Sequence, residues 1–135
     1  MANSFTNYTE NLVLNSILGG AVLTPPSNLY LGLSTTTIAD DGTNITEPKG
    51  GNYARVSVAN NSTSFPTVSN STKQNGITIS FQSATSSWGN IIDFFISDQL
   101  INGNILAYGT LTYPKDVTNG DILSFPVNGL TISLD

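Results

Sequence analysis

The run Trp88–Ser97 is the densest apolar and aromatic stretch of the chain, and it constrains the fold more than any other. With a strand's period of two, one side receives Ile92, Phe94 and Ile96, and the other receives Ile91, Asp93, Phe95 and Ser97. Both faces carry large apolar side chains, so both faces must be covered. The run therefore predicts a central strand that begins at a buried Trp88. What covers its second face becomes a question about function.

Short segments with the pattern of strands occupy most of the remaining chain: 29–33, 53–58, 77–81, 105–113, 122–125 and 130–134. Turn residues separate them, including a stop at Pro114 and an Asn119-Gly120 pair that is typical of a hairpin. About seven short strands at regular spacing indicate a β-sandwich. A length of 135 residues suits one domain and is too short for two. We therefore predict one all-β domain over residues 1–135, an antiparallel β-sandwich over 29–135 with one N-terminal helix.

Residues 4–18 are predicted to form that helix. Asn7 and Glu10 have the spacing of a capping box, Ser4 is an alternative cap, and Gly19-Gly20 ends the helix. At 100° per residue, two narrow apolar stripes run along it, one of Phe5, Tyr8 and Leu12 and another, nearly opposite, of Leu14, Ile17 and Leu18. The first stripe is a candidate contact with another chain. The alternative is that Phe5 lies outside the helix and the rest is ordinary core packing.

The composition excludes several classes of function. The chain has no cysteine and no histidine, so it lacks a thiolate nucleophile, a disulfide framework and the commonest general base. A net charge of -5, with only 4 scattered basic residues, argues against a nucleic-acid partner. No apolar run approaches the ~20 residues of a membrane span. The N-terminus has neither the basic nor the apolar region of a signal peptide, so we expect none.

The acidic residues offer little for catalysis. Most lie beside Gly or Asn in expected turns, where Asp is favoured for backbone reasons. Asp40 and Asp41 share one loop, and Asp98, Asn102 and Asn104 share another; each group could supply oxygen ligands, but neither segment matches an EF-hand calcium loop. We therefore expect no enzyme activity, no catalytic residue, no cofactor and no metal, while a calcium ion in an Asp/Asn loop stays an open alternative.

Two charged residues stand out. Asp93 lies inside the central strand, where a buried carboxylate must be paired or hydrogen-bonded. Arg55 is the only arginine; the alternation of 53–58 places Ala54, Val56 and Val58 toward the core and Tyr53, Arg55 and Ser57 outward. Each of the two charges either fixes loops or lies at a subunit contact.

Several ordered motifs resemble a family of small structural proteins of tailed bacteriophages, known as phage tail fibre proteins, some of which are regarded as head decoration proteins. They span nearly the whole chain: Leu18-Gly19-Gly20, Leu29–Leu33, Thr46-Glu47-Pro48, Gly51–Val56, Trp88–Ile91, Phe95–Asp98, Gly103–Leu106, Asn119–Asp121 and Gly129–Asp135. The resemblance implies a non-enzymatic component of the virion. The segment Gln99–Ile101 is more apolar than the turn that this resemblance implies.

The leading hypothesis is an oligomeric decoration or cement protein that stabilises the capsid. One alternative is a tail fibre or baseplate component that contacts the host, and another is a carbohydrate-binding module using Tyr30, Tyr53 and Tyr108. We expect a homo-oligomer, with a trimer as the guess, whose other partners are the major capsid protein first and tail proteins second. The polar loops 34–51 and 60–75 are expected at the surface, in contact with other virion proteins. The candidate interface residues are Phe5, Tyr8, Leu12, Tyr53, Arg55, Ile91, Asp93 and Phe95.

Overall fold

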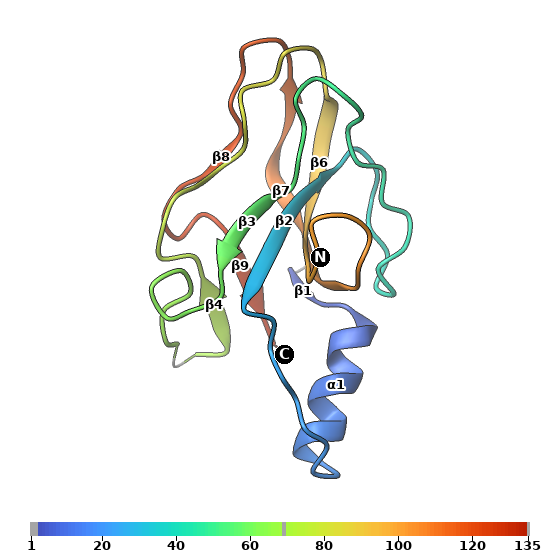
Figure 1. The fold of residues 1–135 in the computed structure, drawn as a ribbon, viewed down its shortest axis with the longest axis vertical. Helices are drawn as coiled ribbons and strands as arrows, with labels where there is room; N and C mark the ends of the chain where they lie inside the picture. The colour runs from blue at the N-terminus through green and yellow to red at the C-terminus, as the bar shows by residue number, and fades with distance from the viewer. Residues whose placement is uncertain (1–2, 69, 135) are drawn as a thin grey trace.

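The computed structural model describes residues 3–68 and 70–134 and shows a mostly β fold with one helix near the N-terminus, as predicted (Figure 1). The helix is α1 (Asn7–Ile17). The strands are β1 (Ser4–Phe5), β2 (Asn28–Ser34), β3 (Val56–Ala59), β4 (Thr72–Gln74), β5 (Ile79–Ser80), β6 (Gly89–Ser97), β7 (Ile105–Val117), β8 (Ser124–Phe125) and β9 (Thr131–Ser133).

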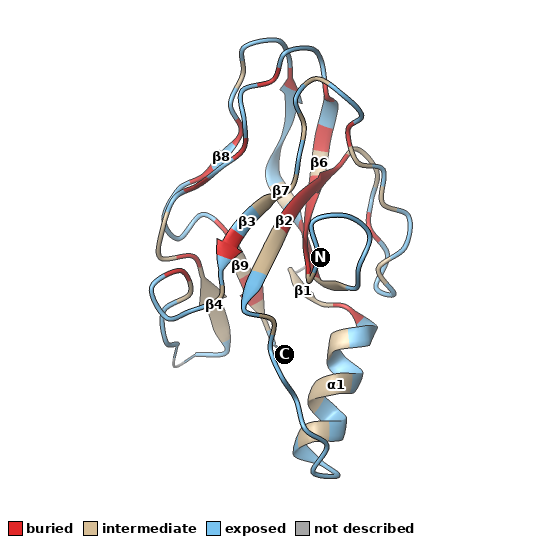
Figure 2. Cartoon of the chain, in the orientation of Figure 1, coloured by how far each residue is buried: buried red, intermediate tan, exposed pale blue. Residues whose placement is uncertain are grey.

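The main sheet is antiparallel, with the strand order β1-β7-β6-β2-β3. Strand β6 lies in the middle, so the prediction of a central strand is confirmed. The opposing layer consists of two short ribbons, β4-β9 and β5-β8, rather than one continuous second sheet. Side chains of β2 and β6 meet those of the ribbons in the main core, where the Phe94 and Phe125 rings lie 5.5 Å apart. Figure 2 shows buried residues along both β2 and β6.

An irregularity in the pairing of β6 with β7 corrects the predicted position of Ile91. Ile91 pairs with Lys115, whereas Asp93 pairs with Thr110, so β7 has extra residues opposite this point of β6. Such a bulge breaks the strict alternation of side chains. Ile91 therefore joins Phe94 in the main core instead of sharing the face of Phe95.

Strand β7 also passes through Pro114, where the sequence predicted a stop. Proline is tolerated here because it lies in the bulged stretch between the residues that pair with β6. The strand continues to Val117, which is fully buried. A proline in this position does not end the strand.

The second face of β6 is covered by the segment 34–51, which we call the covering segment. Its Ile38 packs with Phe95 and Tyr108 in a smaller core. The Ile38 backbone N–H donates to a carboxylate oxygen of Asp93 at 2.8 Å, so this buried acid is hydrogen-bonded, as predicted. The sequence predicted a surface loop here. The covering segment does lie at one side of the molecule (Figure 1), and its Ile38 also closes the second face of the sheet.

Helix α1 is shorter than predicted, because Ser4 and Phe5 form β1 and pair with β7. Phe5 therefore lies outside the helix, as the alternative predicted, but the second part of that alternative, ordinary core packing of the rest, is wrong because no residue of α1 is buried. The N-cap residue is Thr6 rather than Asn7 or Ser4, and its hydroxyl donates to the Ile105 carbonyl at 2.6 Å instead of capping the helix. The Gly19-Gly20 pair follows the last turn, and Gly20 has a φ of 71°, which suits a helix end.

Candidate interaction surfaces

Trp88 is only 4% exposed, which confirms its predicted burial. Its ring nitrogen donates to the Gly51 carbonyl at 2.8 Å, and its ring lies edge-on to Tyr53 with 5.3 Å between centroids. This contact ties the entrance of β6 to the end of the covering segment. It also positions Tyr53 for the polar network described next.

Arg55 is the centre of that network. Its guanidinium makes two hydrogen bonds to Glu47, from Nε at 3.0 Å and from NH2 at 2.9 Å, and donates to two backbone carbonyls of the loop 97–104 at 2.8 Å. The group also lies 4.9 Å from the centroid of the Phe95 ring, at a distance that allows a cation–π contact. Arg55 therefore joins the covering segment, the loop and the central strand.

Tyr53 completes the network. Its hydroxyl donates to Glu47 at 2.7 Å and accepts the Leu33 N–H at 3.0 Å. Burial, with the neighbouring Glu47 carboxylate, raises the pKa of Tyr53 far above its ordinary value. The outward position predicted for Tyr53 and Arg55 is wrong, because β3 begins only at Val56 and the Arg55 side chain is 7% exposed. Glu47 was not predicted as a partner, since nothing in a polar loop marks which acid will meet a distant arginine.

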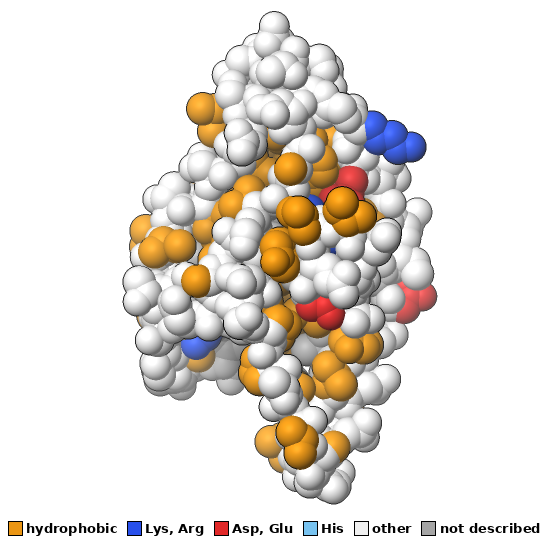
Figure 3. Space-filling model, in the orientation of Figure 1, with side chains coloured by type: hydrophobic (Ala, Val, Ile, Leu, Met, Phe, Trp, Pro, Cys, Tyr) orange, Lys and Arg blue, Asp and Glu red, His pale blue; other side chains and the backbone are white. Residues whose placement is uncertain are grey.

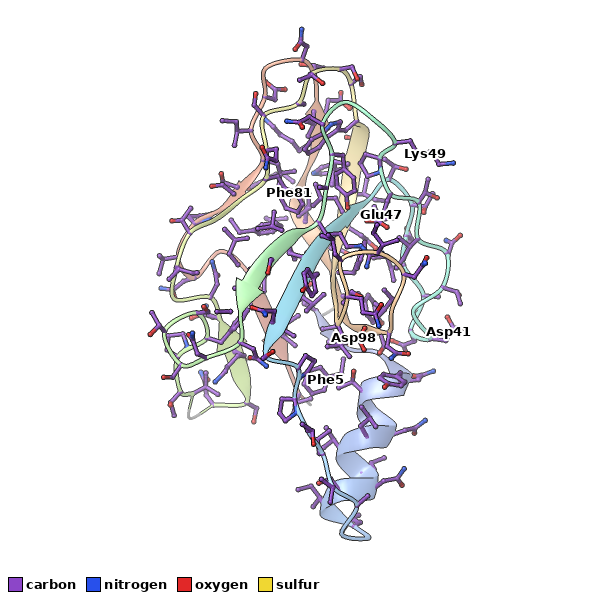
Figure 4. All side chains as sticks on the ribbon, viewed as in Figure 1. Phe5, Asp41, Glu47, Lys49, Phe81 and Asp98 are labelled. Atoms are coloured by element: carbon purple, nitrogen blue, oxygen red, sulfur yellow. The ribbon has the colours of Figure 1, made fainter. Side chains whose placement is uncertain are left out.

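An open groove lies over this network and has a volume of about 670 Å³. Its apolar lining comes from the covering segment, from Ala54 just beyond it and from the loop 97–104: Ile45, Pro48, Ala54, Leu100 and Ile101. Lys49 also lines it and is exposed. Glu47 and Lys49 lie on the same segment (Figure 4). We call this feature the apolar groove; its network floor is neutral because Arg55 is paired with Glu47.

A second apolar surface is formed by α1 together with the link 18–27, which we call the arm. The arm projects from one end of the molecule (Figure 1). Among helices and strands, α1 contacts only β1 and β7, and none of its residues is buried. Four of its apolar residues are between 55% and 93% exposed: Leu14, Ile17, Leu18 and Val22. Hydrophobic side chains are visible at this end of the surface (Figure 3).

The eight predicted interface residues do not share one surface. Ile91, Asp93 and Phe95 are buried by the chain's own residues, so the premise that a second copy must cover them is not met. On the first helical stripe, Phe5 packs against the core and Leu12 is half-buried, while Tyr8 is 41% exposed. The opposite stripe is the more exposed one. Whether any of the eight contacts another chain stays a prediction.

The proposed sugar-binding face is not formed. Tyr108 is buried and its hydroxyl donates to Asp40, while Tyr53 lies under the covering segment. Burial and the Asp40 carboxylate raise the pKa of Tyr108. With two of its three rings used inside the fold, the set including Tyr30 cannot stack together on a sugar.

The acidic loops use their carboxylates for turns. Asp98 accepts hydrogen bonds from the backbone and side-chain amides of Asn104, at 2.8 and 3.0 Å. Asp41 accepts from the backbone and hydroxyl of Thr43, and these bonds hold its pKa below the ordinary value. Within residues 3–68 and 70–134, no three acidic side chains gather as a metal site. No helix in the described part of the chain is long and apolar enough to cross a membrane.

An all-β domain that carries an exposed apolar arm has the features of a subunit that packs against other chains. The comparisons with known proteins agree with the resemblance noted in the sequence. Residues 4–133 match the family model described as Podophage GP4 fiber I protein gp80, and the chain belongs to this family of phage fibre proteins. No curated protein matches the chain. The family places the protein among the structural components of a phage virion.

Proposed function

We propose that the chain is a non-enzymatic structural subunit of a phage tail fibre, held in the virion through its arm. The observation that carries this proposal is the exposure of Leu14, Ile17, Leu18 and Val22 on a projecting element. Large apolar side chains grouped on a projection are a common sign of a protein contact. The family description, which names a fibre protein, favours the fibre over the capsid.

Apart from Glu10 in the first turn of α1, the arm is also free of charge. No charged residue stands between Glu10 and Asp40, so the whole arm beyond the first turn of α1 can be buried without desolvating an ion. A homo-oligomer, with other tail proteins as further partners, would bury this surface permanently. Symmetric association of copies is the usual way in which such surfaces are covered.

Counting the copies of the chain in purified particles tests the location. Mass spectrometry against isotope-labelled peptides should find from a few to tens of copies per particle, and antibodies should label the tail. Hundreds of copies with label over the head would instead indicate capsid decoration, and absence from the particle would contradict any virion role.

Screens for glycan and peptide hydrolysis with the purified chain should show no turnover. Turnover that is lost in Glu47→Gln would contradict the proposal that the chain is not an enzyme.

A further inference from the structure

The arm and the apolar groove are two apolar surfaces of opposite shape at different places on the molecule. The arm projects at one end, whereas the covering segment and the loop 97–104 that line the groove lie beside the main sheet (Figure 1). The helix contacts only β1 and β7 among the helices and strands, and the groove lining includes no residue of the arm. Neither surface is therefore covered by the other within one chain.

We propose that the arm of one copy seats in the apolar groove of the next copy, so that copies associate head to tail. The inference rests on the proposed function, because it names the surface that receives the arm. The groove's volume, about 670 Å³, is within the range of about 300–1,000 Å³ in which protein pockets enclose a group of drug size. Space of this size accommodates side chains such as Ile17 and Leu18 from a projecting helix end.

The apolar residues of the two surfaces match in kind. Leu100 is 51% and Ile101 69% exposed on the groove side. On the arm, Ile17 and Leu18 are each about three-quarters exposed. Joining the two surfaces would remove four large apolar side chains from water, which forms the apolar centre that a stable interface needs. The polar residues of the loop and the link would form the rim.

The charges of the two surfaces also complement each other. The last turn of α1 contains no basic residue, so its C-terminal carbonyls lack a cationic side chain of their own helix. These carbonyls carry a partial negative charge that favours a nearby cation. Lys49 lines the groove and is exposed, and it is the cation that a docked helix end would meet. Replacing Lys49 with methionine should weaken the association about two- to fivefold.

The proposed contact joins two different patches, so each copy still has one free arm and one free groove after the first contact. Contacts of this kind repeat until they close into a ring or grow into a filament. A closed ring of three would be the trimer predicted from the sequence. Two arms packing on each other would instead give a dimer and would leave both grooves empty.

Engineered disulfides test the contact directly, because the native chain contains no cysteine. We would prepare Ile17→Cys and Ile101→Cys separately in the full chain, mix them under oxidising conditions, and separate the products without reductant. A disulfide forms only when the two Cα atoms approach to about 4.4–6.8 Å. The expected product is a covalent dimer in the mixture, in at least tenfold excess over a mixture of Ile17→Cys with Val127→Cys. Val127 is also half-exposed but lies outside the groove lining.

The double variant Ile17→Cys/Ile101→Cys distinguishes the modes of association. Head-to-tail contacts should give a ladder of dimers, trimers and larger species, which ends at the size of the ring if the contacts close and continues upward if they form a filament. The same experiment on purified particles that carry the double variant covers association that occurs only in the virion. Absence of cross-linking in both settings, or dimers formed equally well by Ile17→Cys alone, would overturn the inference.

A serine pair in the groove separates this inference from the proposed function. Leu100→Ser with Ile101→Ser should weaken self-association at least tenfold. If particles take up this variant at the wild-type level but exclude an arm variant, the groove is not the receptor, and the arm still holds the chain in the virion. If particles take up both variants normally, the proposed function fails as well.

Discussion

Replacing Glu47 with glutamine removes one charge from the Arg55 network with almost no change of shape. Arg55 is 7% exposed and Glu47 28%, so the substitution leaves a buried guanidinium without its counter-ion. Removing one partner of a buried ion pair costs about 3–5 kcal/mol. Water reaches Glu47 in part, and Arg55 keeps its two carbonyl acceptors in the loop 97–104. The expected loss of unfolding free energy is therefore smaller, about 2–3 kcal/mol.

Urea denaturation followed by Trp88 fluorescence measures this loss, because Trp88 is the only tryptophan and is buried. For a chain of this length, each kcal/mol lowers Tm by about 3–5 °C, so Tm should fall by about 6–15 °C. Asp116→Asn is the matched control: it makes the same chemical change at an exposed position and should stay within about 0.5 kcal/mol of wild type.

A loss below about 0.5 kcal/mol for Glu47→Gln, equal to the control, would refute the reasoning. It would mean that Arg55 can reach water without its partner, and that the covering segment is not held by this pair. Contacts other than the Arg55–Glu47 pair would then have to hold the floor of the apolar groove in place.

Three other predictions follow from the packing. Trp88→Ala should cost about 3–5 kcal/mol in unfolding free energy by urea titration with circular dichroism, and wild-type stability would contradict its core position. Gly32→Ala should cost about 1–3 kcal/mol, because a Cβ there would overlap the Phe95 ring, and an unchanged Tm would show that the ring is elsewhere. Tyr53 and Tyr108 have raised pKa values, so the native state keeps protons that the unfolded chain releases above about pH 10. Their stabilising contribution is complete below that pH and declines as the pH rises further, so the urea midpoint should fall between pH 9 and 11; an ultraviolet titration in which all five tyrosines ionise near pH 10 would contradict this.

Much of the sheet was predictable because its signal is local. Three leucines at alternate positions in 29–33 all contribute to the main core, as their spacing predicts. The run 88–97 indicated a strand covered on both sides, which β6 is. The position of Ile91 was not predictable in the same way, since the bulge that reorients it comes from extra residues in β7.

The site was less predictable because it is built from contacts between distant segments. In the sequence, the alternating pattern of a strand begins at Tyr53. In the structure, β3 begins only at Val56, and Tyr53 and Arg55 precede it and bind Glu47 of the covering segment. The length and polarity of 34–51 indicated a surface loop, although Ile38 and Glu47 give it a role in the core and in the network. Periodicity cannot identify such partners.

The exposed stripe of the helix is a related case. The sequence showed two stripes and could not rank them, because the choice depends on how α1 joins the sheet. The pairing of Phe5 with Ala107 turns the first stripe toward the body and leaves the second one in solvent. We therefore propose the opposite stripe as the contact, and an interface at Phe5, Tyr8 and Leu12 stays a prediction.

The most direct test of the proposed role is the amount of an arm variant that enters the phage particle. We would supply Ile17→Ser/Leu18→Ser during infection in place of the wild-type chain, with Val127→Ser as an exposed control outside the arm. Quantitative mass spectrometry of purified particles would count each chain, after circular dichroism has shown that each is folded. Attachment through the arm predicts wild-type copy numbers for the control and at least a tenfold decrease for the arm variant. Wild-type copy numbers for the arm variant would contradict it.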